Sequence, residues 1–532
     1  MTENTQNNPQ KAGADAQISS SNLAELQAIC QRVLGGRRLV IASNRGPVTY
    51  EKTESGELVA NRGSGGVVTA LSSLTHITPL TWVAAALSEA DREIAILEES
   101  ELPPEAQPED NLRMRFVNID EDSFDKYLNV ISNPLLWFVQ HEMNDLLLEE
   151  RETISGMWLA WREGYVFANR EFARVVAEET GREDSAPYVV FHDYQLYLSP
   201  GILRQGHPDL TLMHFTHIPW PGPETWQNLP STWVRTICKS LLDCDIVGFQ
   251  TNSAAQAFAD TCRAFVAGLT VEETDQGYLN ISKLNDKGES SVTRVRAYPI
   301  SIDPQEVLKV YHTPEATEWK QQLTEELSDY EKLIVRVDRL DPNKNVLAGF
   351  ESYQQMLKNR PDLNGKVVFL ALLVPTRESV QEYAQYKDQT FELIDQINQE
   401  FGREGWEPVH YIYGNDYPRA LAALSMADVV LVNSVADGMN LVAKEAVIVS
   451  ERQSVLVLST NTGAWEELGQ YSSGVAPDDV EGTAQALITA LEMPEAEKAA
   501  RSQALSEIIY KNDLSNWLAS HLSGLGKFKR QP

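Results

Sequence analysis

The chain has 532 residues, with 45 Lys or Arg and 76 Asp or Glu, so its formal net charge at pH 7 is −31. This charge argues against binding to nucleic acid or an anionic membrane through general electrostatics. The apolar content of 42% is typical of a globular protein, and no run reaches the roughly 18 uninterrupted apolar residues of a membrane span. The length favours about two or three domains.

The first segment, residues 1–22, is polar and has neither the basic start nor the apolar core of a secretory signal. We expect a disordered tail there. The four cysteines form no CxxC pair, so reduced thiols are more plausible than a disulfide framework or a zinc site. These features favour a cytoplasmic protein.

From Arg38 onward, short apolar runs alternate with longer amphipathic stretches, which is the pattern of parallel sheets covered by helices. A first group of expected strands comprises residues 39–43, 188–192, 211–215 and 245–250. A second group comprises residues 332–337, 366–374, 409–414, 428–433 and 454–459. The sequence therefore predicts an α/β protein.

Prolines in residues 297–304 suit a connection between two lobes, and we place the boundary near residue 305. The expected lobes are residues 23–304 and residues 305–505, each doubly wound. Two such lobes that face each other would bring the carboxyl ends of both sheets to one cleft, where ligands of these sheets bind.

The first strand ends in the motif SNRGP, which contains Arg45, and a glycine loop at residues 63–66 follows. Gly65 and Gly66 would let backbone amides approach a phosphate closely. Such a glycine loop is a weak signal by itself.

Two further motifs, HDYQ and THIPWPGPE, follow the next two expected strands. A carboxylate at a buried strand end is costly to desolvate unless something binds it. Asp193 is therefore a candidate to hold an acceptor hydroxyl or to assist its deprotonation. A helix N-cap for Asp193 and a satisfied core imidazole for His217 are equally plausible alternatives.

The strand at 332–337 leads into DRLDPNKN, which places Arg339 and Lys344 five residues apart. Two cations in one turn can neutralise a diphosphate leaving group, whose developing charge is the main electrostatic problem in glycosyl transfer. A basic pair on the surface is the alternative. The strand end, the proline turn and a second phosphate-binding loop downstream favour the functional interpretation.

That second loop is ADGMNLVAKE, which follows the apolar run 429–432 and opens onto a helix. Its unpaired amides at the positive end of the helix dipole can hold a phosphate, and Gly438 lets the backbone come close. Asp437 and Glu445 can accept hydrogen bonds from the hydroxyls of a sugar and a ribose. An N-cap for Asp437 and a solvated helix face for Glu445 are the alternatives. The pattern favours a nucleotide-sugar site.

These motifs, together with YLNVISNPLLW at 127–137 and VPTR at 374–377, occur in the order and approximate spacing of trehalose-6-phosphate synthases. The chain resembles this family from about residue 37 to about residue 522. The resemblance implies a GT-B fold, with two Rossmann-like lobes and the active site in the cleft between them. It also implies that residues 506–532 hold a C-terminal helix that crosses back to the first lobe, followed by a tail.

The implied activity is a retaining transfer of glucose from a nucleotide diphosphate glucose to glucose 6-phosphate, which gives α,α-trehalose 6-phosphate. UDP-glucose is the first expected donor, and ADP-glucose and GDP-glucose are alternatives. The resemblance implies no cofactor and no catalytic metal. Neither nucleic acid nor membrane is an expected partner, and a homo-oligomer stays open.

The resemblance also assigns residues. The catalytic set is Asp193, His217, Arg339, Lys344 and Asp437. The donor set is Gly65, Gly66, Arg339, Lys344, Asp437, Gly438, Met439, Asn440, Leu441, Val442 and Glu445, with Leu441 and Val442 at the nucleoside and Glu445 at the ribose. The acceptor set is Arg45, Tyr127, Trp137, Asp193 and Arg377, with both arginines on the acceptor phosphate.

The chain departs from the family pattern on the acceptor side. Ala85 and Leu128 stand where the family commonly has aromatic residues, and Gln195 replaces a histidine. Another phosphorylated acceptor, such as glycerol 3-phosphate, is therefore a close alternative. A noncatalytic sugar-phosphate sensor is a further alternative, but the donor cations and carboxylates are all present.

Overall fold

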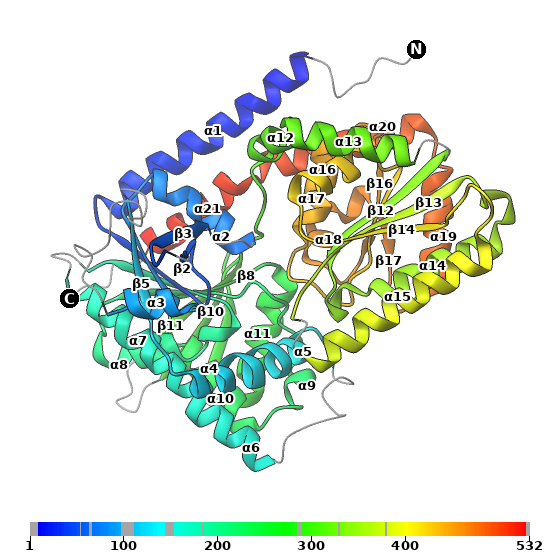
Figure 1. Cartoon of the computed structure of the whole chain (residues 1–532). Coiled ribbons are helices and arrows are strands. Elements are labelled where there is room, and N and C mark those ends of the chain that lie inside the picture. The colour runs from blue at the N-terminus through cyan, green and yellow to red at the C-terminus, as the bar shows by residue number, and fades with distance from the viewer. Residues whose placement is uncertain are drawn as a thin grey trace. The chain divides into compact units, whose positions relative to one another are not determined.

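The computed structural model describes residues 9–53, 55–62, 66–96, 111–143, 154–182, 186–284, 290–327, 330–377 and 380–527. The chain divides into two compact units (Figure 1). The N-terminal unit comprises Ala24–Pro299 and Trp517–Pro532, and the C-terminal unit comprises Ile300–Asn516 and Met1–Leu23. Within the described ranges, no helix has the length and apolar character needed to cross a membrane.

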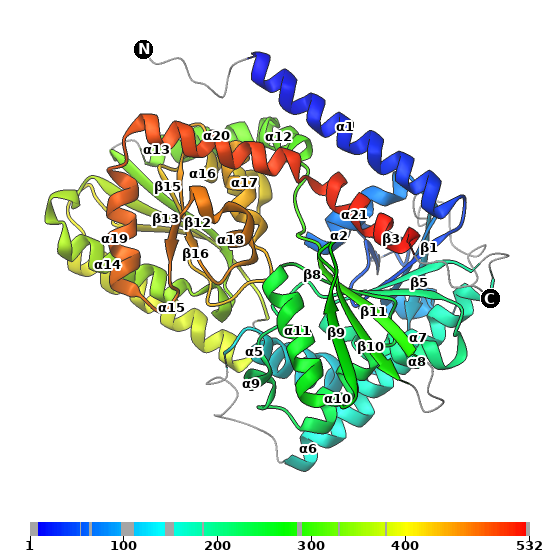
Figure 2. The same ribbon diagram turned by 180° about the vertical axis from the view of Figure 1, so that it is seen from behind.

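The N-terminal unit is built on a nine-stranded sheet with the order β5-β4-β1-β6-β7-β8-β11-β10-β9. Its strands are β1 (Leu39–Ser43), β4 (Leu80–Ala85), β5 (Leu112–Val117), β6 (Tyr188–His192), β7 (Thr211–Phe215), β8 (Ile246–Phe249), β9 (Leu269–Glu273), β10 (Leu279–Leu284) and β11 (Ser290–Ala297). Along this order, each strand from β5 through β4, β1, β6, β7 and β8 to β11 is parallel to its neighbour. Strands β10 and β9 then extend the sheet as an antiparallel ribbon, which is seen in Figure 2. A separate antiparallel pair is formed by β2 (Val48–Lys52) and β3 (Leu58–Arg62).

The helices of this unit include two π-helical segments, η5 (Lys126–Leu136) and η7 (Ala160–Val166), that pack against each other. The α-helices are α2 (Gly66–Ser72), α3 (Glu89–Ile94), α4 (Glu121–Asp125), α5 (Trp137–Gln140), α6 (Ile154–Leu159), α7 (Phe167–Thr180), α8 (Ser199–Gly206), α9 (Pro223–Trp226), α10 (Ser231–Leu241), α11 (Asn252–Phe265) and α21 (Leu514–Gly526). The chain also contains α1 (Pro9–Leu34).

The C-terminal unit has a six-stranded, fully parallel sheet with the order β14-β13-β12-β15-β16-β17. Its strands are β12 (Lys332–Arg339), β13 (Val367–Val374), β14 (Val409–Tyr413), β15 (Val429–Val432), β16 (Val455–Ser459) and β17 (Ser473–Val475). Its α-helices are α12 (Pro304–Tyr311), α13 (Pro314–Glu326), α14 (Val346–Asn359), α15 (Gln381–Phe401), α16 (Tyr417–Met426), α17 (Leu441–Val449), α18 (Gly463–Leu468), α19 (Val480–Leu491) and α20 (Glu495–Lys511). Helices α14, α15 and α19 cover one face, and α12, α13, α16, α17 and α20 cover the other (Figure 1).

Every strand expected from the sequence is confirmed, with bounds that differ by at most a few residues. The reason is visible in β1, β6, β7 and β16, whose residues are all buried. Strands that are covered by helices on both faces read as uninterrupted apolar runs. The α/β class and the two parallel-sheet units therefore agree with the prediction.

None of β2, β3, β4 and β17 was predicted from the sequence, and the strands near the two edges of the large sheet were also missed. Strand β5 reads LRMRFV, and β9 to β11 also alternate between apolar and polar residues. An edge strand is only partly covered, so its apolar signal is weaker.

Three predicted boundaries need correction. The expected tail, residues 1–22, is wrong from Pro9 onward, because these residues begin α1, where Lys, Ala and Gln are good helix formers. The lobe boundary falls between Pro299 and Ile300, before residue 305. A boundary at residue 506 would cut the continuous helix α20, and the chain enters the N-terminal unit only at Trp517.

Helix α21 packs inside the N-terminal unit. The Trp517 indole donates a hydrogen bond to the Tyr298 carbonyl oxygen across 3.0 Å. The His521 ring lies 4.7 Å from the Phe215 ring, centroid to centroid, and 4.6 Å from the Tyr298 ring. These contacts place α21 against residues at the ends of β7 and β11.

All four cysteines, Cys30, Cys238, Cys244 and Cys262, are free thiols and are buried. Burial raises the pKa of Cys30 to about 11 and raises the pKa of Cys244 and Cys262 well above the usual value. The expected absence of a disulfide framework agrees with these free thiols.

Candidate active site

In the C-terminal unit, the predicted cations and carboxylates follow three neighbouring strands. Arg377 follows β13, Arg339 ends β12 and Asp437 follows β15, and the sheet order is β13-β12-β15. Because these strands are parallel, their carboxyl ends lie at one edge of the sheet. The fold therefore brings together residues that are about a hundred positions apart in the sequence.

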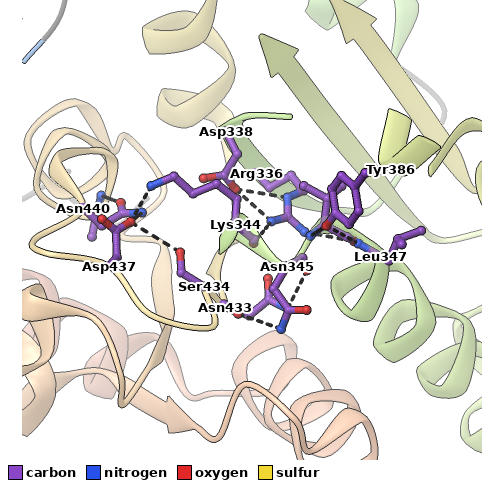
Figure 3. A network of polar contacts seen from close by, with 12 residues as sticks. Arg336, Asp338, Lys344, Asn345, Leu347, Tyr386, Asn433, Ser434, Asp437 and Asn440 are labelled. Atoms are coloured by element: carbon purple, nitrogen blue, oxygen red, sulfur yellow. Dashed lines mark hydrogen bonds and ion pairs between the residues drawn. The ribbon is translucent and has the colours of Figure 1, made fainter. Parts of the chain in front are cut away.

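Lys344 lies in the short loop between β12 and α14, and its ammonium group contacts the Asp437 carboxylate (Figure 3). Both side chains are largely buried, at 12% and 14% exposure. This pair brings the two loops that were predicted to hold a diphosphate and a sugar to one point. A phosphate bound there would meet an ammonium group that Asp437 already holds in position.

Arg339 makes two hydrogen bonds to one oxygen of the buried Asp341 carboxylate, at 2.8 Å from Nε and 2.5 Å from Nη2. Burial alone would raise the pKa of Asp341, but the charges of Arg339, Arg377 and Lys344 hold that pKa below its usual value. Asp341 is thus an anion that orients Arg339, whose side chain stays 48% exposed.

Arg377 adopts a backbone conformation with φ 43°, which is uncommon for a residue other than glycine. Its guanidinium group donates a hydrogen bond to the Tyr383 hydroxyl and lies 5.3 Å from the centre of that ring. The pKa of Arg339 is raised chiefly by Asp341, and the charge of Arg377 opposes that effect. The two arginines are therefore close enough for their charges to interact.

The loop 437–440 folds around Asp437. The Asp437 carboxylate also accepts hydrogen bonds from Asn440 Nδ2 at 3.2 Å and from Ser434 Oγ at 3.5 Å. Asn440 has φ 82° and caps α17, since its side-chain oxygen accepts from the Ala443 amide at 3.1 Å. The cap alternative for Asp437 is therefore wrong, because Asn440 occupies that position.

Helix α17 begins at Leu441, so the Leu441 and Val442 amides have no partner within the helix. Both residues are partly exposed, whereas Met439 is buried and its carbonyl oxygen accepts from the Ala464 amide at 2.9 Å. The Asp437 carbonyl oxygen accepts from the Gly463 amide at 3.0 Å. The loop is thus held from α18, and the helix start is available to a phosphate.

Gly463 permits this arrangement, and no sequence motif pointed to its role. A Cβ atom at this position would lie 1.8 Å from the Gly438 carbonyl oxygen. Only glycine therefore allows α18 to approach the loop so closely.

Glu445 lies one turn into α17 and accepts a hydrogen bond from the Tyr417 hydroxyl at 3.0 Å. Burial raises the pKa of Glu445 to about 7, although the Tyr417 hydrogen bond favours the ionised form. The solvated-face alternative for Glu445 is wrong because the carboxylate is partly buried and paired. Tyr417, which is partly exposed, is a neighbour that motif reasoning did not find.

In the N-terminal unit, three predicted residues likewise follow neighbouring strands. Arg45 follows β1, Asp193 follows β6 and His217 follows β7. Arg45 is exposed, and its carbonyl oxygen accepts a 2.6 Å hydrogen bond from Ser43 Oγ, which in turn accepts one from the Trp82 indole at 2.8 Å. These two hydrogen bonds support the turn that carries Arg45.

Asp193 has φ 72°, so the chain is strained where β6 ends. Its carboxylate accepts a hydrogen bond from the His217 amide at 3.2 Å and makes no capping bond to the short helix that follows. The N-cap alternative for Asp193 is therefore wrong. The carboxylate instead links the ends of β6 and β7.

Both ring nitrogens of His217 lie near partners. Nε2 is 3.0 Å from His192 Nδ1, and Nδ1 is 3.4 Å from Gln250 Nε2. Burial lowers the pKa of His217 well below its usual value, and the neighbouring histidines act in the same direction. His217 is therefore a neutral imidazole whose ring nitrogens both have protein neighbours, so it is poorly suited to proton transfer at neutral pH.

Tyr127 and Trp137, which were both predicted to bind the acceptor, are buried to different degrees. Tyr127 is fully buried and its hydroxyl donates to Asn44 Oδ1 at 3.1 Å. Trp137 is 7% exposed and stacks on His141 with ring centres 4.1 Å apart. The expected direct contact with an acceptor is therefore wrong for Tyr127, because its ring is enclosed and supports the residue before Arg45.

The glycine loop is only partly described. Gly65 lies outside the described residues, and Gly66 is the first residue of α2. Ala85, where an aromatic residue was expected, is buried in β4.

Two units on parallel sheets, with cations and carboxylates at the strand ends, define a glycosyltransferase of the GT-B class. The family model described as glycosyltransferase family 20 matches residues 37–527. The chain belongs to this family.

Among relatives, the trehalose-6-phosphate synthase of Mycobacterium avium (strain 104) is 32% identical over 500 residues, which cover 93% of this chain and 96% of the relative. The UDP-forming alpha,alpha-trehalose-phosphate synthase A of Dictyostelium discoideum is 30% identical over 500 residues, which cover 92% of this chain and 62% of the relative. The chain thus spans less than two thirds of the Dictyostelium protein.

Two solved structures have the same fold. An E. coli structure with bound UDP-2-fluoro glucose is 28% identical, with a TM-score of 0.77, and the match covers 92% of this chain and 99% of that one. A UDP-forming alpha,alpha-trehalose-phosphate synthase from Burkholderia xenovorans, in complex with glucose-6-phosphate, is 27% identical, with a TM-score of 0.77 and the same coverage.

Proposed function

We propose that the protein transfers glucose from UDP-glucose to glucose 6-phosphate with retention of configuration, giving α,α-trehalose 6-phosphate and UDP. The observation that carries the proposal is the contact between Lys344 and Asp437, which joins a diphosphate-binding cation to a sugar-binding carboxylate. Family membership and the ligands bound to the E. coli and Burkholderia proteins support the same substrates.

The donor belongs to the C-terminal unit. Arg339 and Lys344 stabilise the charge that develops on the diphosphate as the bond from glucose C1 breaks. The amides of Gly438, Met439 and Asn440 and the start of α17 receive the phosphates, as at other helix N-termini. Leu441 and Val442 then lie at the nucleoside, and Glu445 accepts hydrogen bonds from the ribose hydroxyls.

The reaction needs no protein nucleophile. The acceptor hydroxyl oxygen attacks C1 on the face that the diphosphate leaves, and its proton passes to the departing phosphate oxygen. Asp437 is the residue that we assign to the transferred glucose, and we assign His217, whose imidazole is neutral, to the same sugar. Asp193 orients the acceptor hydroxyl, and Arg45 and Arg377 bind the acceptor phosphate.

A second acceptor is favoured by one observation. Leu128, which is partly exposed, and Ala85 stand where aromatic residues were expected, so neither offers a ring on which a hexose can stack. Glycerol 3-phosphate has no sugar ring that would need to stack on an aromatic side chain. Its product would be a glucosylglycerol phosphate.

A direct assay separates these candidates. Purified protein is incubated with UDP-, ADP- or GDP-glucose and either acceptor, and the product's anomeric configuration is read by NMR. We expect turnover with UDP-glucose and glucose 6-phosphate. Turnover with glycerol 3-phosphate alone would overturn the proposed acceptor, and failure of every donor to react would overturn the transferase assignment for this chain.

The matched variants are Lys344→Ala and Lys366→Ala. Lys366 is exposed and precedes β13, at the opposite edge of the sheet from Lys344. Loss of Lys344 should lower kcat/KM on the order of 100-fold. The Lys366 variant should keep the wild-type rate, which shows that the effect of Lys344 is local.

A further inference from the structure

The backbone around Lys344 is held by a complete set of hydrogen bonds. The Lys344 and Asn345 amides donate to the carbonyl oxygens of Asp341 and Pro342, at 2.9 and 3.0 Å. The Lys344 carbonyl oxygen accepts from Arg336 Nη2 at 3.0 Å, and the Asn345 carbonyl oxygen accepts from Asn433 Nδ2 at 3.1 Å. In this segment, nearby backbone carbonyl oxygens thus satisfy the two amides, and the side chains of Arg336 and Asn433 donate to the two carbonyl oxygens.

The next residue, Val346, completes the pattern. Its amide donates to the Tyr386 hydroxyl at 2.6 Å, and its carbonyl oxygen accepts from Arg336 Nη1 at 3.3 Å. The Leu347 amide also donates to Tyr386, at 3.3 Å. All six backbone polar groups of residues 344–346 are therefore hydrogen-bonded, and Figure 3 shows Arg336 and Tyr386 beside this segment.

Burial of Arg336, whose side chain holds this loop, costs desolvation free energy. It lies in the middle of β12 and is fully buried, and its guanidinium group donates to Asp338 Oδ2 at 2.8 and 3.2 Å. Arg336 and Asp338 share one face of the strand because side chains alternate. A buried ion pair often gives less stability than apolar residues of similar size, so stability alone is a weak explanation for it.

The neighbouring helix leaves room for this guanidinium group. A Cβ atom on Gly349 of α14 would lie 2.3 Å from Arg336 Nη1. The loop also contains Asn345 in the left-handed conformation, with φ 57°, and its side chain donates to the carbonyl oxygens of Asn433 and Pro477. The arrangement therefore holds a strained turn in one conformation.

We propose that Arg336, supported by Asp338, and Tyr386 are positioning residues that hold the backbone of Lys344 so that its ammonium group meets the donor diphosphate. This inference rests on the proposed function, because it assumes that Lys344 binds the diphosphate. Neither residue touches the substrate. Their effect passes through the Lys344 backbone.

The mildest test is Tyr386→Phe, which removes only the hydroxyl that accepts from the Val346 and Leu347 amides. We expect the Kd of UDP and the KM of UDP-glucose to rise together, about fivefold. The KM of the acceptor should stay unchanged. The matched control is Tyr353→Phe, since the Tyr353 hydroxyl bonds the carbonyl oxygens of Val367 and Pro408, away from the loop.

The second test is the double variant Arg336→Met with Asp338→Asn, which removes both members of the buried pair and leaves no uncompensated charge. UDP affinity should fall by roughly tenfold or more. If the pair only stabilised the fold, the variant would lower Tm while the folded protein bound UDP as the wild type does. That result would overturn the proposal.

A Lys344→Ala background gives the sharpest criterion. There, Tyr386→Phe should cause no further loss of UDP affinity, because the positioned group is absent. Equal losses with and without Lys344 would overturn the inference. A wild-type protein that does not bind UDP would instead contradict the proposed function, so the two failures are distinguishable.

Discussion

The Tyr417 hydroxyl donates a hydrogen bond to the Glu445 carboxylate across 3.0 Å, and burial raises the pKa of that carboxyl to about 7. A ribose-binding carboxylate must be ionised to accept hydrogen bonds from both hydroxyls. Glu445 is therefore half protonated near neutral pH in the unliganded protein. Donor binding competes with that proton.

The first prediction is a pH dependence of donor affinity. Because only the ionised form binds well, the Kd of UDP should rise roughly tenfold between about pH 8 and about pH 6. Calorimetry across this range measures it directly, and protons should be released on binding below the midpoint. The Glu445→Gln variant should bind UDP more weakly, and its Kd should not show this stepwise change with pH. A wild-type Kd that is flat over the range would contradict the assignment.

The second prediction concerns Tyr417→Phe. The hydroxyl lowers the pKa of Glu445 toward its usual value, so its removal should move the step to higher pH. Affinity should fall near pH 7 and return to the wild-type value well above it. A uniform loss of affinity at every pH would instead mean that Tyr417 contacts the nucleotide itself.

The third prediction separates the roles of the Lys344–Asp437 pair. Asp437→Asn removes the carboxylate that is assigned to the transferred glucose, and kcat/KM should fall on the order of 100-fold. UDP alone carries no glucose, and Lys344 loses a competing anion, so the Kd of UDP should stay the same or decrease. UDP titration and steady-state kinetics on the same preparation test both parts. Weakening of UDP binding to the level of Lys344→Ala would contradict the division of roles.

The fourth prediction tests the support of the sugar-binding loop. In Gly463→Ala, the new Cβ would overlap the Gly438 carbonyl oxygen at 1.8 Å, so the loop must move. A displacement of this order should cost roughly 100-fold in kcat/KM. Gly414→Ala is the control, because no heavy atom lies within 4 Å of a Cβ at that position. Equal activity of the two variants would show that the loop adapts.

The sequence predicted the central strands and the donor motifs because both signals are local. Apolar runs such as 429–432 mark strands that are buried on both faces, and the phosphate-binding residues follow those runs directly. The parallel sheet then places Arg339 and Asp437 at one edge, because β12 and β15 are neighbours. The contact between Lys344 and Asp437 follows from this topology.

The residues that sequence reasoning missed act through distant partners. Gly463 matters because α18 approaches Gly438, and Tyr417 matters because α16 lies beside α17. Nothing in their own neighbourhoods marks either residue. Arg336 was detectable in principle, since a charged residue in the middle of an apolar strand is rare without a partner. Tyr127 was misassigned because its motif does not reveal that the ring is enclosed.

The four buried thiols have a practical consequence. All four thiols are buried, and the raised pKa values of Cys30, Cys244 and Cys262 leave those three with little of the thiolate that reacts with a thiol-reactive dye at neutral pH. The native chain should therefore react only slowly with such reagents. One cysteine introduced on the exposed surface of each unit would carry a dye pair without removal of any natural residue. Energy transfer between the dyes would then follow the separation of the two units as UDP is added.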